Sequence, residues 1–178
     1  MMPNFLNPKQ IIDSLSFLET NMIALDIGSG SGGWTIPLAK KLENGKVYAL
    51  DIKEEALSAL RSKLDSERIY NVELLLADIE KGVKMADNKI DFVILSNTLF
   101  SLNEKNKVFE EIKRVLREDG YLLIIDWKKV NNIGPQIKAV SIEEIKQIAE
   151  GLNLKLEQEL DLGNYHFALI FKKWTKKR

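Results

Sequence analysis

Short apolar runs alternate with longer amphipathic stretches along most of the chain. The apolar runs predict strands at residues 22–27, 46–51, 72–76, 90–95 and 121–126. In the longer stretches apolar residues recur three and four positions apart, which predicts helices at residues 9–18, 34–42, 54–64 and 105–116. Because strands that alternate with crossover helices pair in parallel, we expect a doubly wound α/β fold. The third and fourth strands are expected to be covered on both faces of the sheet.

Local residues indicate where two of the helices begin. Asn7 followed by Pro8 is typical of a helix N-terminus, because the side chain caps the first turn and proline fits its first position. Ser141 with Glu144 forms a capping-box pattern, which predicts a helix that runs to about residue 149. Gly151 is the expected stop of that helix.

The last part of the chain differs from the rest. Residues 154–160 and 165–171 flank the glycine and asparagine at 163–164, a pattern that favours an antiparallel hairpin. The aspartate and glycine at 119–120 predict a turn before the fifth strand. A nicotinamide-binding domain would end in another parallel strand, so the hairpin argues against that class of protein.

A glycine-rich turn follows the first predicted strand. Gly28, Gly30 and Gly32 allow a sharp turn and close approach of a ligand to the backbone, because none of them carries a Cβ. Gly28, Gly30 and Gly33 also satisfy the spacing G-x-G-x-x-G of dinucleotide-binding loops. The acid Asp26 stands two residues before the turn. We therefore expect a ligand here, and Asp26 bears on which one.

The charge of Asp26 separates two ligand classes. A pyrophosphate favours backbone N–H groups and the positive end of the following helix, and a nearby carboxylate opposes it. A ligand with a protonated amine would instead gain a charge-assisted hydrogen bond. The acid therefore disfavours an NAD-dependent oxidoreductase and favours a ligand that carries an ammonium group.

Asp26, Gly28, Gly30 and Gly32 together resemble the first motif of the class I S-adenosylmethionine-dependent methyltransferases, acid-x-Gly-x-Gly-x-Gly. The resemblance extends over residues 23–171. It implies one domain over residues 1–178, with a mostly parallel seven-stranded sheet and an antiparallel C-terminal strand. It also implies S-adenosylmethionine as the cofactor and S-adenosylhomocysteine as the product. The N-terminal helix within residues 1–20 is expected to act as a partial lid.

Acids and their neighbours at the strand ends are the other candidate cofactor residues. Asp51 stands near the spacing at which an acid accepts hydrogen bonds from ribose hydroxyls, and Ile52 is expected beside the adenine. The resemblance implies that Asp78, with Ile79 next to it, contacts the adenine amino group. It also places Ser96 near the sulfonium. The predicted cofactor residues are Asp26, Gly28, Ser29, Gly30, Gly32, Asp51, Ile52, Asp78, Ile79 and Ser96.

Several of these positions have a structural alternative. Asp51 would otherwise cap the following helix, and Asp78 would lie in a surface turn. Asp91 opens the fourth strand, so we expect a structural role for it, because ligands bind at the opposite ends of such strands. His166 is expected to be a packed residue of the hairpin rather than a general base.

The acceptor side is less defined by the sequence. Asp126 followed by Trp127 is similar to a pair in the small-molecule methyltransferases of ubiquinone and menaquinone biosynthesis. Trp127 has an alternative role as an aromatic residue that covers the sheet edge. The sulfonium already activates the methyl group, so no catalytic residue is assigned. The predicted acceptor-pocket residues are Asn97, Phe100, Trp127, Pro135 and Ile137.

Composition restricts the possible partners and chemistry. The chain has 178 residues, with 26 basic and 26 acidic side chains, so no global positive field favours nucleic acid. It has no cysteine, which excludes disulfides, thiolate metal sites and a thiol nucleophile, and no metal site is expected. Residues 172–178 are locally basic and are expected to be a solvated end. We expect a cytoplasmic protein without membrane insertion, and leave a homo-oligomer open.

Two other functions remain open besides methyl transfer to a small molecule. One is a methyltransferase that acts on tRNA or protein together with a partner subunit. The other is a cofactor-binding module without catalysis. Because 178 residues leave little room for a recognition domain, the sequence favours the small-molecule acceptor.

Overall fold

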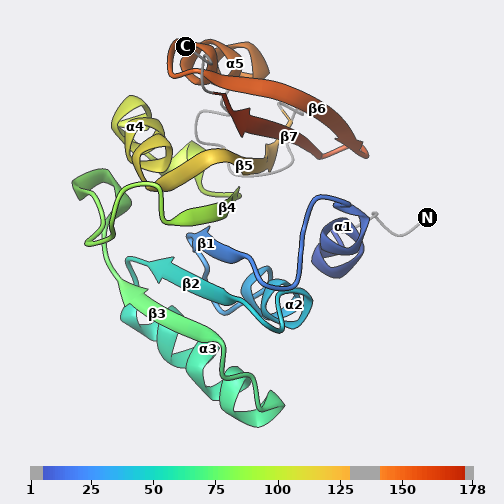
Figure 1. Ribbon diagram of the computed structural model, residues 1–178, viewed down its shortest axis with the longest axis vertical. Coiled ribbons are helices and arrows are strands. Elements are labelled where there is room, and N and C mark those ends of the chain that lie inside the picture. The colour runs from blue at the N-terminus through green and yellow to red at the C-terminus, as the bar shows by residue number, and fades with distance from the viewer. Residues whose placement is uncertain (1–5, 129–140, 175–178) are drawn as a thin grey trace.

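The computed structural model describes residues 6–128 and 141–174 and contains one seven-stranded sheet. The order of its strands is β3-β2-β1-β4-β5-β7-β6 (Figure 1). The strands are β1 (Ile23–Ile27), β2 (Lys46–Asp51), β3 (Val72–Leu76), β4 (Ile90–Ser96), β5 (Leu116–Trp127), β6 (Leu154–Leu162) and β7 (His166–Lys173). The first five are parallel, and β7 runs antiparallel to both β5 and β6. The predicted fold class and the antiparallel hairpin are confirmed.

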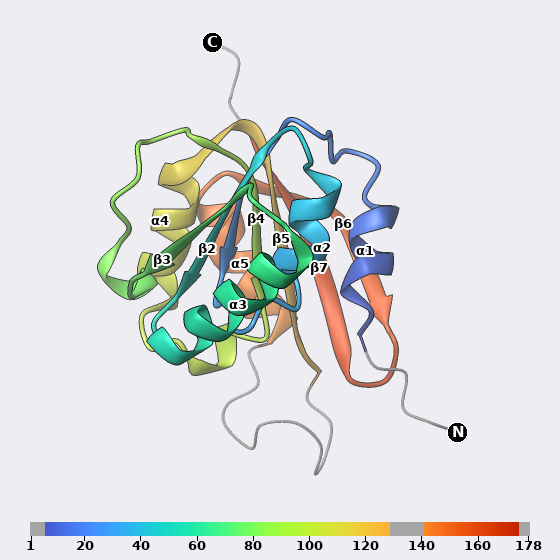
Figure 2. The ribbon, with the colours of Figure 1, turned by 90° about the horizontal axis from the view of Figure 1, so that it is seen from below.

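Helices cover both faces of this sheet (Figure 2). The helices are α1 (Pro8–Ser14), α2 (Thr35–Lys41), α3 (Glu54–Glu67), α4 (Lys105–Val115) and α5 (Ile142–Gly151), with short 3-10 turns η1 (Ile79–Lys81) and η2 (Leu99–Ser101). Side chains of α4 and α5 share one core with alternate residues of the strands. Side chains of α1, α2 and α3 pack on the opposite face. The alternation along each strand thus sends successive side chains into two separate cores.

The strand order reverses between β1 and β4, which sets the position of the site. Along the chain the sheet grows outward from β1 through β2 to β3, then returns to β4 on the other side of β1 (Figure 1). In open α/β sheets ligands bind beyond the carboxyl ends of the strands at such a reversal. The glycine-rich turn after β1 lies at this point.

Several local predictions are confirmed. β2 and β3 have the predicted bounds. The side chain of Asn7 accepts a hydrogen bond from Gln10 N at 3.1 Å and caps α1. Ser141 Oγ accepts one from Glu144 N at 2.9 Å and caps α5. These signals act within a few residues of the chain, so the sequence alone specifies them.

The predicted ends of two helices are wrong. The helix expected over residues 9–18 ends at Ser14, because Leu15 takes an extended conformation. The apolar spacing beyond it reflects burial rather than helix, since Leu15 and Leu18 are buried through turns. Gly151 does not stop α5 but is its last residue, and Asn153 supplies the left-handed conformation, with φ of 58°.

The edges of the sheet correct two further expectations. β3 is an edge strand with partly exposed residues, and Leu76 is 57% exposed, so β3 is not covered on both faces as β4 is. β5 starts at Leu116, earlier than predicted. The turn expected at residues 119–120 lies within it, as a left-handed Asp119 at a shift in register with β4.

The basic segment near the C-terminus is not simply a solvated end. Residues 172 and 173 belong to β7, and Lys173 is buried. Its Nζ donates to Lys113 O at 3.0 Å and Leu116 O at 2.8 Å, which satisfies carbonyl groups at the end of α4. In the part of the chain that the structure describes, no helix has the length and apolar character to cross a membrane.

The structural role expected for Asp91 is confirmed. Asp91 lies at the start of β4, at the opposite end of the parallel strands from the glycine-rich turn. Its Oδ2 accepts a hydrogen bond from Ile23 N at 2.6 Å, and its carboxylate pairs with Arg117. The residue therefore joins the beginnings of β1, β4 and β5.

Candidate cofactor cleft

The glycine-rich turn is tied to the end of β2. Gly28 N and Ser29 N both donate to Leu50 O, at 2.8 and 3.0 Å. Gly28, Gly30 and Gly32 all have positive φ, with values of 73°, 52° and 93°. Only glycine adopts such a series of left-handed conformations without strain. The turn is thus a fixed backbone cradle rather than a loose loop.

Two of these glycines also allow close packing. A Cβ at Gly28 would lie 2.3 Å from Thr98 Oγ1, on the segment that follows β4. A Cβ at Gly32 would lie 2.4 Å from Leu60 Cδ1 on α3. The turn therefore fits between the end of β4 and α3 only because side chains are absent at these positions.

Asp51 connects the turn to the end of β2. Its Oδ2 accepts a hydrogen bond from Gly30 N at 2.7 Å, and its Oδ1 accepts one from Lys53 N at 2.9 Å. The second bond matches the alternative in which Asp51 supports the start of α3. The first bond places the carboxylate against the glycine-rich turn, where a ribose would lie. Both roles are therefore compatible with its position.

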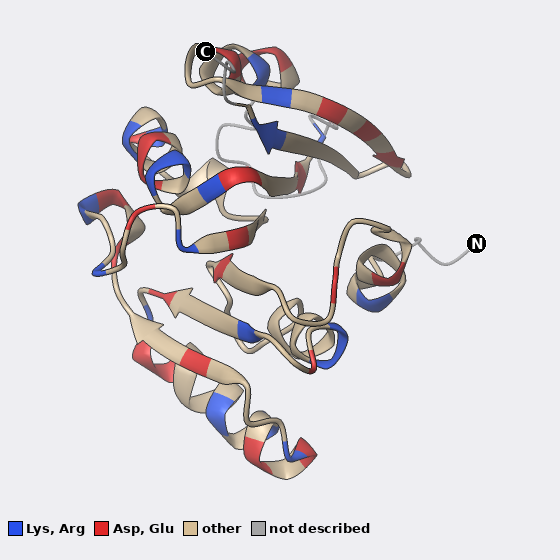
Figure 3. Ribbon diagram, viewed as in Figure 1, with Lys and Arg blue, Asp and Glu red and all other residues tan. Residues whose placement is uncertain are grey.

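Asp26 lies beneath the turn rather than on the cleft surface. It is 1% exposed, and Thr35 Oγ1 donates to its Oδ2 at 2.6 Å. Burial, together with the smaller effect of the charge of Asp51, raises the pKa of Asp26 to about 7, although the hydrogen bond from Thr35 opposes the shift. Figure 3 shows the acidic ends of β1 and β2 beside each other. Direct contact of Asp26 with an amine stays a prediction.

The buried carboxyl of Asp26 predicts an unusual dependence of stability on pH. Its pKa is about 7 in the folded chain against an ordinary value of 3.8, so unfolding releases a proton between these values. The free energy of unfolding should therefore fall as pH rises through this window. In the unaltered chain, Asp26 should lower the free energy of unfolding by about 3 kcal/mol between pH 5 and 8. This decrease should be absent in Asp26→Asn when both proteins are unfolded with urea in the absence of cofactor.

The matched control for this measurement is Asp78→Asn. Asp78 is a partly exposed carboxylate whose pKa is lowered, first by its hydrogen bond with Lys81, so it is ionised throughout the window. The control should show the same change between pH 5 and 8 as the unaltered chain. An equal pH dependence in the Asp26→Asn variant would show that Asp26 does not titrate in this range.

A cleft of about 660 Å3 opens beyond the ends of β1, β2 and β4. Its residues come from the glycine-rich turn, the start of α3, η1 and η2. They are Ile27, Gly28, Gly30, Leu50, Asp51, Ile52, Lys53, Ala56, Ala77, Asp78, Ile79, Glu80, Asn97, Thr98, Phe100, Ser101 and Leu102. The structure thus brings most of the predicted cofactor residues to one place, although they lie on separate segments of the chain.

Ile52, Asp78 and Ile79 form one end of the cleft. Ile52 is 63% exposed, which is unusual for an isoleucine and leaves an apolar surface for a flat ring. Asp78 caps η1 by accepting a hydrogen bond from Glu80 N at 3.0 Å, and Lys81 Nζ lies 3.1 Å from its other oxygen. Asp78 therefore occupies a turn, as the alternative stated, and that turn lies in the wall of the cleft.

Buried polar atoms around the cleft lack partners. Among the described residues, Ser29 Oγ, Ser96 Oγ and Asn97 Oδ1 are buried without a hydrogen bond. Ser29 lies between two glycines of the cradle, and Ser96 precedes Asn97 at the end of β4. Native proteins leave few such atoms unsatisfied. These unpartnered atoms and the backbone cradle at Gly28 both suit a ligand with several polar groups.

Asn97 and Asp126 are functional candidates of different kinds. Asn97 has a φ of 50°, a strained conformation that residues at binding sites often adopt. Asp126 was noted in the sequence only beside Trp127. The structure shows it 2% exposed, with its carboxylate accepting from Leu99 N at 3.0 Å and Trp127 N at 2.8 Å. It therefore holds η2, which carries Phe100, against the end of β5.

The predicted acceptor residues are only partly assembled. Asn97 and Phe100 line the cleft. Trp127 lies one strand further along the sheet, against the ring of His166. Pro135 and Ile137 lie outside the described residues. The role of Trp127 in acceptor binding thus stays a prediction, and its contact with His166 was not expected.

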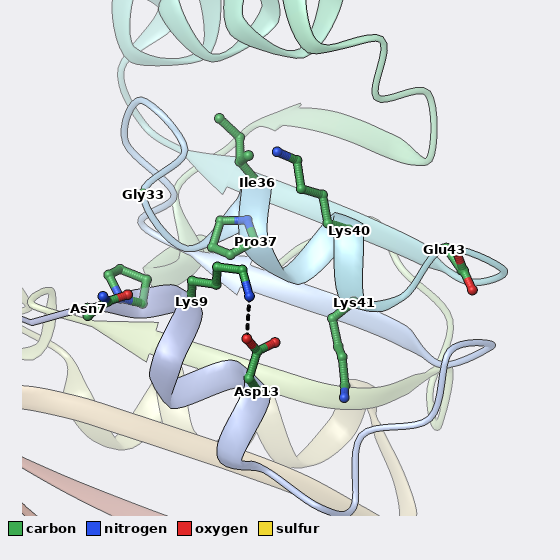
Figure 4. Close-up of a pocket in the computed structure, with 10 residues that line it drawn as sticks. Asn7, Lys9, Asp13, Gly33, Ile36, Pro37, Lys40, Lys41 and Glu43 are labelled. Atoms are coloured by element: carbon green, nitrogen blue, oxygen red, sulfur yellow. Dashed lines mark hydrogen bonds and ion pairs between the residues drawn. The ribbon is translucent and has the colours of Figure 1, made fainter.

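A second hollow of about 490 Å3 lies between α1 and α2 (Figure 4). Lys9 and Asp13 on its wall pair with each other, and Lys40 pairs with Glu67 at 2.6 Å. All four side chains are substantially exposed, so this hollow is a surface groove between two packed helices. No α1 residue is among the described residues that line the cofactor cleft, so the lid role of residues 1–20 stays a prediction.

Known proteins are similar to this chain in both sequence and fold. The methyltransferase domain model matches residues 18–168. The ubiquinone/menaquinone biosynthesis C-methyltransferase UbiE of Hydrogenovibrio crunogenus is 33% identical over 118 residues, 65% of this chain and 46% of that protein. A demethylmenaquinone methyltransferase of Bacillus mycoides is 30% identical over 112 residues, 62% of this chain and 47% of that protein. The chain thus spans about half the length of these curated relatives.

A solved structure covers far more of the chain. The crystal structure of an S-adenosylmethionine-dependent methyltransferase from Aquifex aeolicus has a TM-score of 0.86 and 31% identity, over 96% of this chain and 91% of that chain. The cleft and this likeness together define the class of S-adenosylmethionine-dependent methyltransferases. The chain belongs to the methyltransferase domain family, and S-adenosylmethionine is its cofactor.

Proposed function

We propose that this protein transfers the methyl group of S-adenosylmethionine to a small-molecule acceptor by in-line displacement. The single observation that carries this proposal is the cleft itself. There the glycine cradle, the Asp51 carboxylate and Asn97 line the cleft at the reversal of strand order, and the buried, unpartnered hydroxyls of Ser29 and Ser96 lie on the segments beside it. Such a constellation suits a ligand with an amino acid end, a ribose and a flat base.

The residues divide the cofactor among them. Asp51 would accept hydrogen bonds from the ribose hydroxyls, and Ile52 would pack against one face of the adenine. Asp78 and the backbone at Ile79 would contact the exocyclic amine of the base. Their positions at the walls of the cleft support this assignment. Asp26, buried below the cradle, would supply negative charge toward the ammonium group.

The catalytic task of the chain is positioning. The bound sulfonium supplies an activated methyl group, so the protein needs no metal or covalent intermediate of its own. The left-handed Asn97 turns the chain at the end of β4, and the carboxylate of Asp126 accepts a hydrogen bond from Leu99 N that holds η2 in place, which fixes one wall of the cleft. Holding two reactants in line contributes up to about 7–11 kcal/mol to a reaction of this kind.

The relatives favour a quinone-like aromatic acceptor. Both curated relatives named above are methyltransferases of ubiquinone or menaquinone compounds by name. The shared region is about half of each relative. The acceptor atom, a homo-oligomeric state and a cytoplasmic location also stay predictions, as does the expectation that nucleic acid is not a partner.

Calorimetry with two cofactors tests the assignment. S-adenosylhomocysteine should bind the chain, whereas NAD should not, because Asp26 opposes a pyrophosphate at the glycine-rich turn. In thermal unfolding, a ligand at 100 times its dissociation constant stabilises the folded state by about 2.7 kcal/mol. Stabilisation by NAD alone would overturn the proposal. A labelled RNA that bound in a salt-dependent way would instead favour the alternative acceptor class.

A further inference from the structure

His166 is the one histidine of the chain, and the cofactor cleft leaves it unused. It is the first residue of β7 and pairs with Trp127, the last residue of β5, at the end of the sheet where the parallel strands finish. The centroids of the two rings are 4.1 Å apart, with an angle of 42° between their planes. The two side chains therefore form an aromatic pair where β5 ends and β7 begins, and neither is among the residues that line the cleft.

The imidazole has an atom without a partner. His166 is 8% exposed, and its Nε2 is buried with no hydrogen bond among the described residues. Burial, and then the positive charge of Lys128, hold the pKa of the ring below its ordinary value. A neutral imidazole can accept a hydrogen bond at one nitrogen while the other carries the proton. The ring is thus suited to receive a proton at neutral pH.

The charged groups beside His166 are already occupied. Lys128 Nζ donates to Asp161 Oδ1 at 2.5 Å and to Gly163 O at 2.6 Å, across the hairpin. The carboxylate of Asp126 accepts two backbone N–H groups. Because Lys128, Asp161 and Asp126 make these bonds, none of them is a hydrogen-bond partner of Nε2. The Nε2 atom can therefore accept a hydrogen bond from a bound molecule.

The place of the pair in the sheet connects it to the methyl donor. β5 lies between β7 and β4, and Ser96 at the end of β4 is level with Ile125, two residues before Trp127. Neighbouring strands are about 4.8 Å apart, so His166 lies two strand spacings, or about 10 Å, across the sheet from β4, and two residues beyond the level of Ser96. A flat acceptor that lies against Trp127 can therefore face both the imidazole and the cleft.

We propose that Nε2 of His166 is the general base of methyl transfer, and that the acceptor is an aromatic hydroxyl compound lying against Trp127. This inference rests on the proposed function. His166 takes the hydroxyl proton, and the electron pair of the resulting oxyanion forms the new bond to the methyl carbon. The sulfur–carbon bond breaks with its electrons returning to sulfur, which leaves a neutral thioether. The imidazolium then releases its proton to water.

Nuclear magnetic resonance can observe this histidine without ambiguity, because the chain has only one. The full chain is labelled with 15N-histidine, saturated with S-adenosylhomocysteine and titrated anaerobically with 1,4-dihydroxynaphthalene. We expect the Nε2 resonance to shift and saturate with the probe. Trp127→Ala should abolish that shift but leave S-adenosylhomocysteine binding within twofold. An Nε2 resonance that does not respond at millimolar probe overturns the inference.

Turnover of the same probe with S-adenosylmethionine is the second readout. His166→Gln should lower kcat by about 100-fold or more, the range of general base catalysis, with KM for S-adenosylmethionine within twofold. Added imidazole should partly restore His166→Ala. Tyr165→Phe, which alters the neighbouring ring, is the matched control and should keep kcat.

The outcomes separate the two proposals. An unchanged kcat in His166→Gln overturns the role of His166 as the base. The lack of a methylated product from an unaltered chain that binds S-adenosylmethionine overturns the acceptor class. Failure of the unaltered chain to bind S-adenosylmethionine counts against the proposed function itself. The titration uses the unaltered chain, so it remains decisive where a His166 variant does not fold.

Discussion

Gly28→Ala is expected to abolish cofactor binding and to destabilise the fold. The new Cβ would lie 2.3 Å from Thr98 Oγ1, on a backbone with φ of 73°. A left-handed conformation costs a residue with a Cβ about 1–2 kcal/mol, and overpacking costs about 1–3 kcal/mol. We therefore expect the free energy of unfolding to fall by about 2–5 kcal/mol in urea. Calorimetry should show affinity for S-adenosylhomocysteine about 100-fold lower or undetectable, because the cradle must move.

Two further variants separate the causes of this loss. Gly30 also has a positive φ, but a Cβ added there would meet nothing within 4 Å. We therefore expect Gly30→Ala to show only the cost of the left-handed backbone and not the cost of overpacking. Thr98→Ala combined with Gly28→Ala removes both atoms that make the closest contacts. The double variant should regain stability relative to Gly28→Ala alone. Equal stability of the single and double variants would show that the contact with Thr98 is not responsible.

Asp51→Ala is expected to have the largest effect on cofactor affinity among the side-chain variants. The carboxylate accepts hydrogen bonds from Gly30 N and Lys53 N, so its removal leaves two N–H groups without their partner. Each unsatisfied buried group costs about 1–3 kcal/mol, and the ribose would lose its acceptor as well. We expect a fall in S-adenosylmethionine affinity of about 100-fold or more by calorimetry, which corresponds to about 2.7 kcal/mol.

The controls for Asp51 test whether charge or hydrogen bonding matters. Asp51→Asn keeps one acceptor oxygen, so it should lose less stability than Asp51→Ala while still losing most of the affinity. Asp65→Ala removes an exposed acid from α3, outside the cleft, and should change neither property. Unaltered affinity in Asp51→Ala would remove this residue from the cofactor site and leave only its role at the start of α3.

Much of the fold could be predicted because its signals are local. The alternation of apolar runs and amphipathic stretches predicted the doubly wound sheet, and the caps at Asn7 and Ser141 marked two helix starts. The acid and glycines of the first turn predicted the kind of ligand from a few adjacent residues. Each of these features depends on at most seven consecutive residues, or on the spacing of apolar residues along the chain.

The errors occurred where tertiary contacts override local preference. Leu15 and Leu18 continue the helical spacing but are buried through turns, and β3 is apolar in sequence although it lies at the exposed edge of the sheet. Lys173 reads as part of a basic end, yet it is buried because it satisfies the carbonyls at the end of α4. In each case the deciding partner lies far away in the sequence.

The sequence by itself determined the class of fold, the cradle for the cofactor and the acids at the strand ends, because backbone freedom at glycine and hydrophobic period are properties of short segments. Only the tertiary structure decided that Asp26 lies buried with Thr35, that Asp126 holds η2, and that His166 meets Trp127. Such contacts join separate elements of the fold, and their burial and spacing exist only once those elements have packed around the sheet.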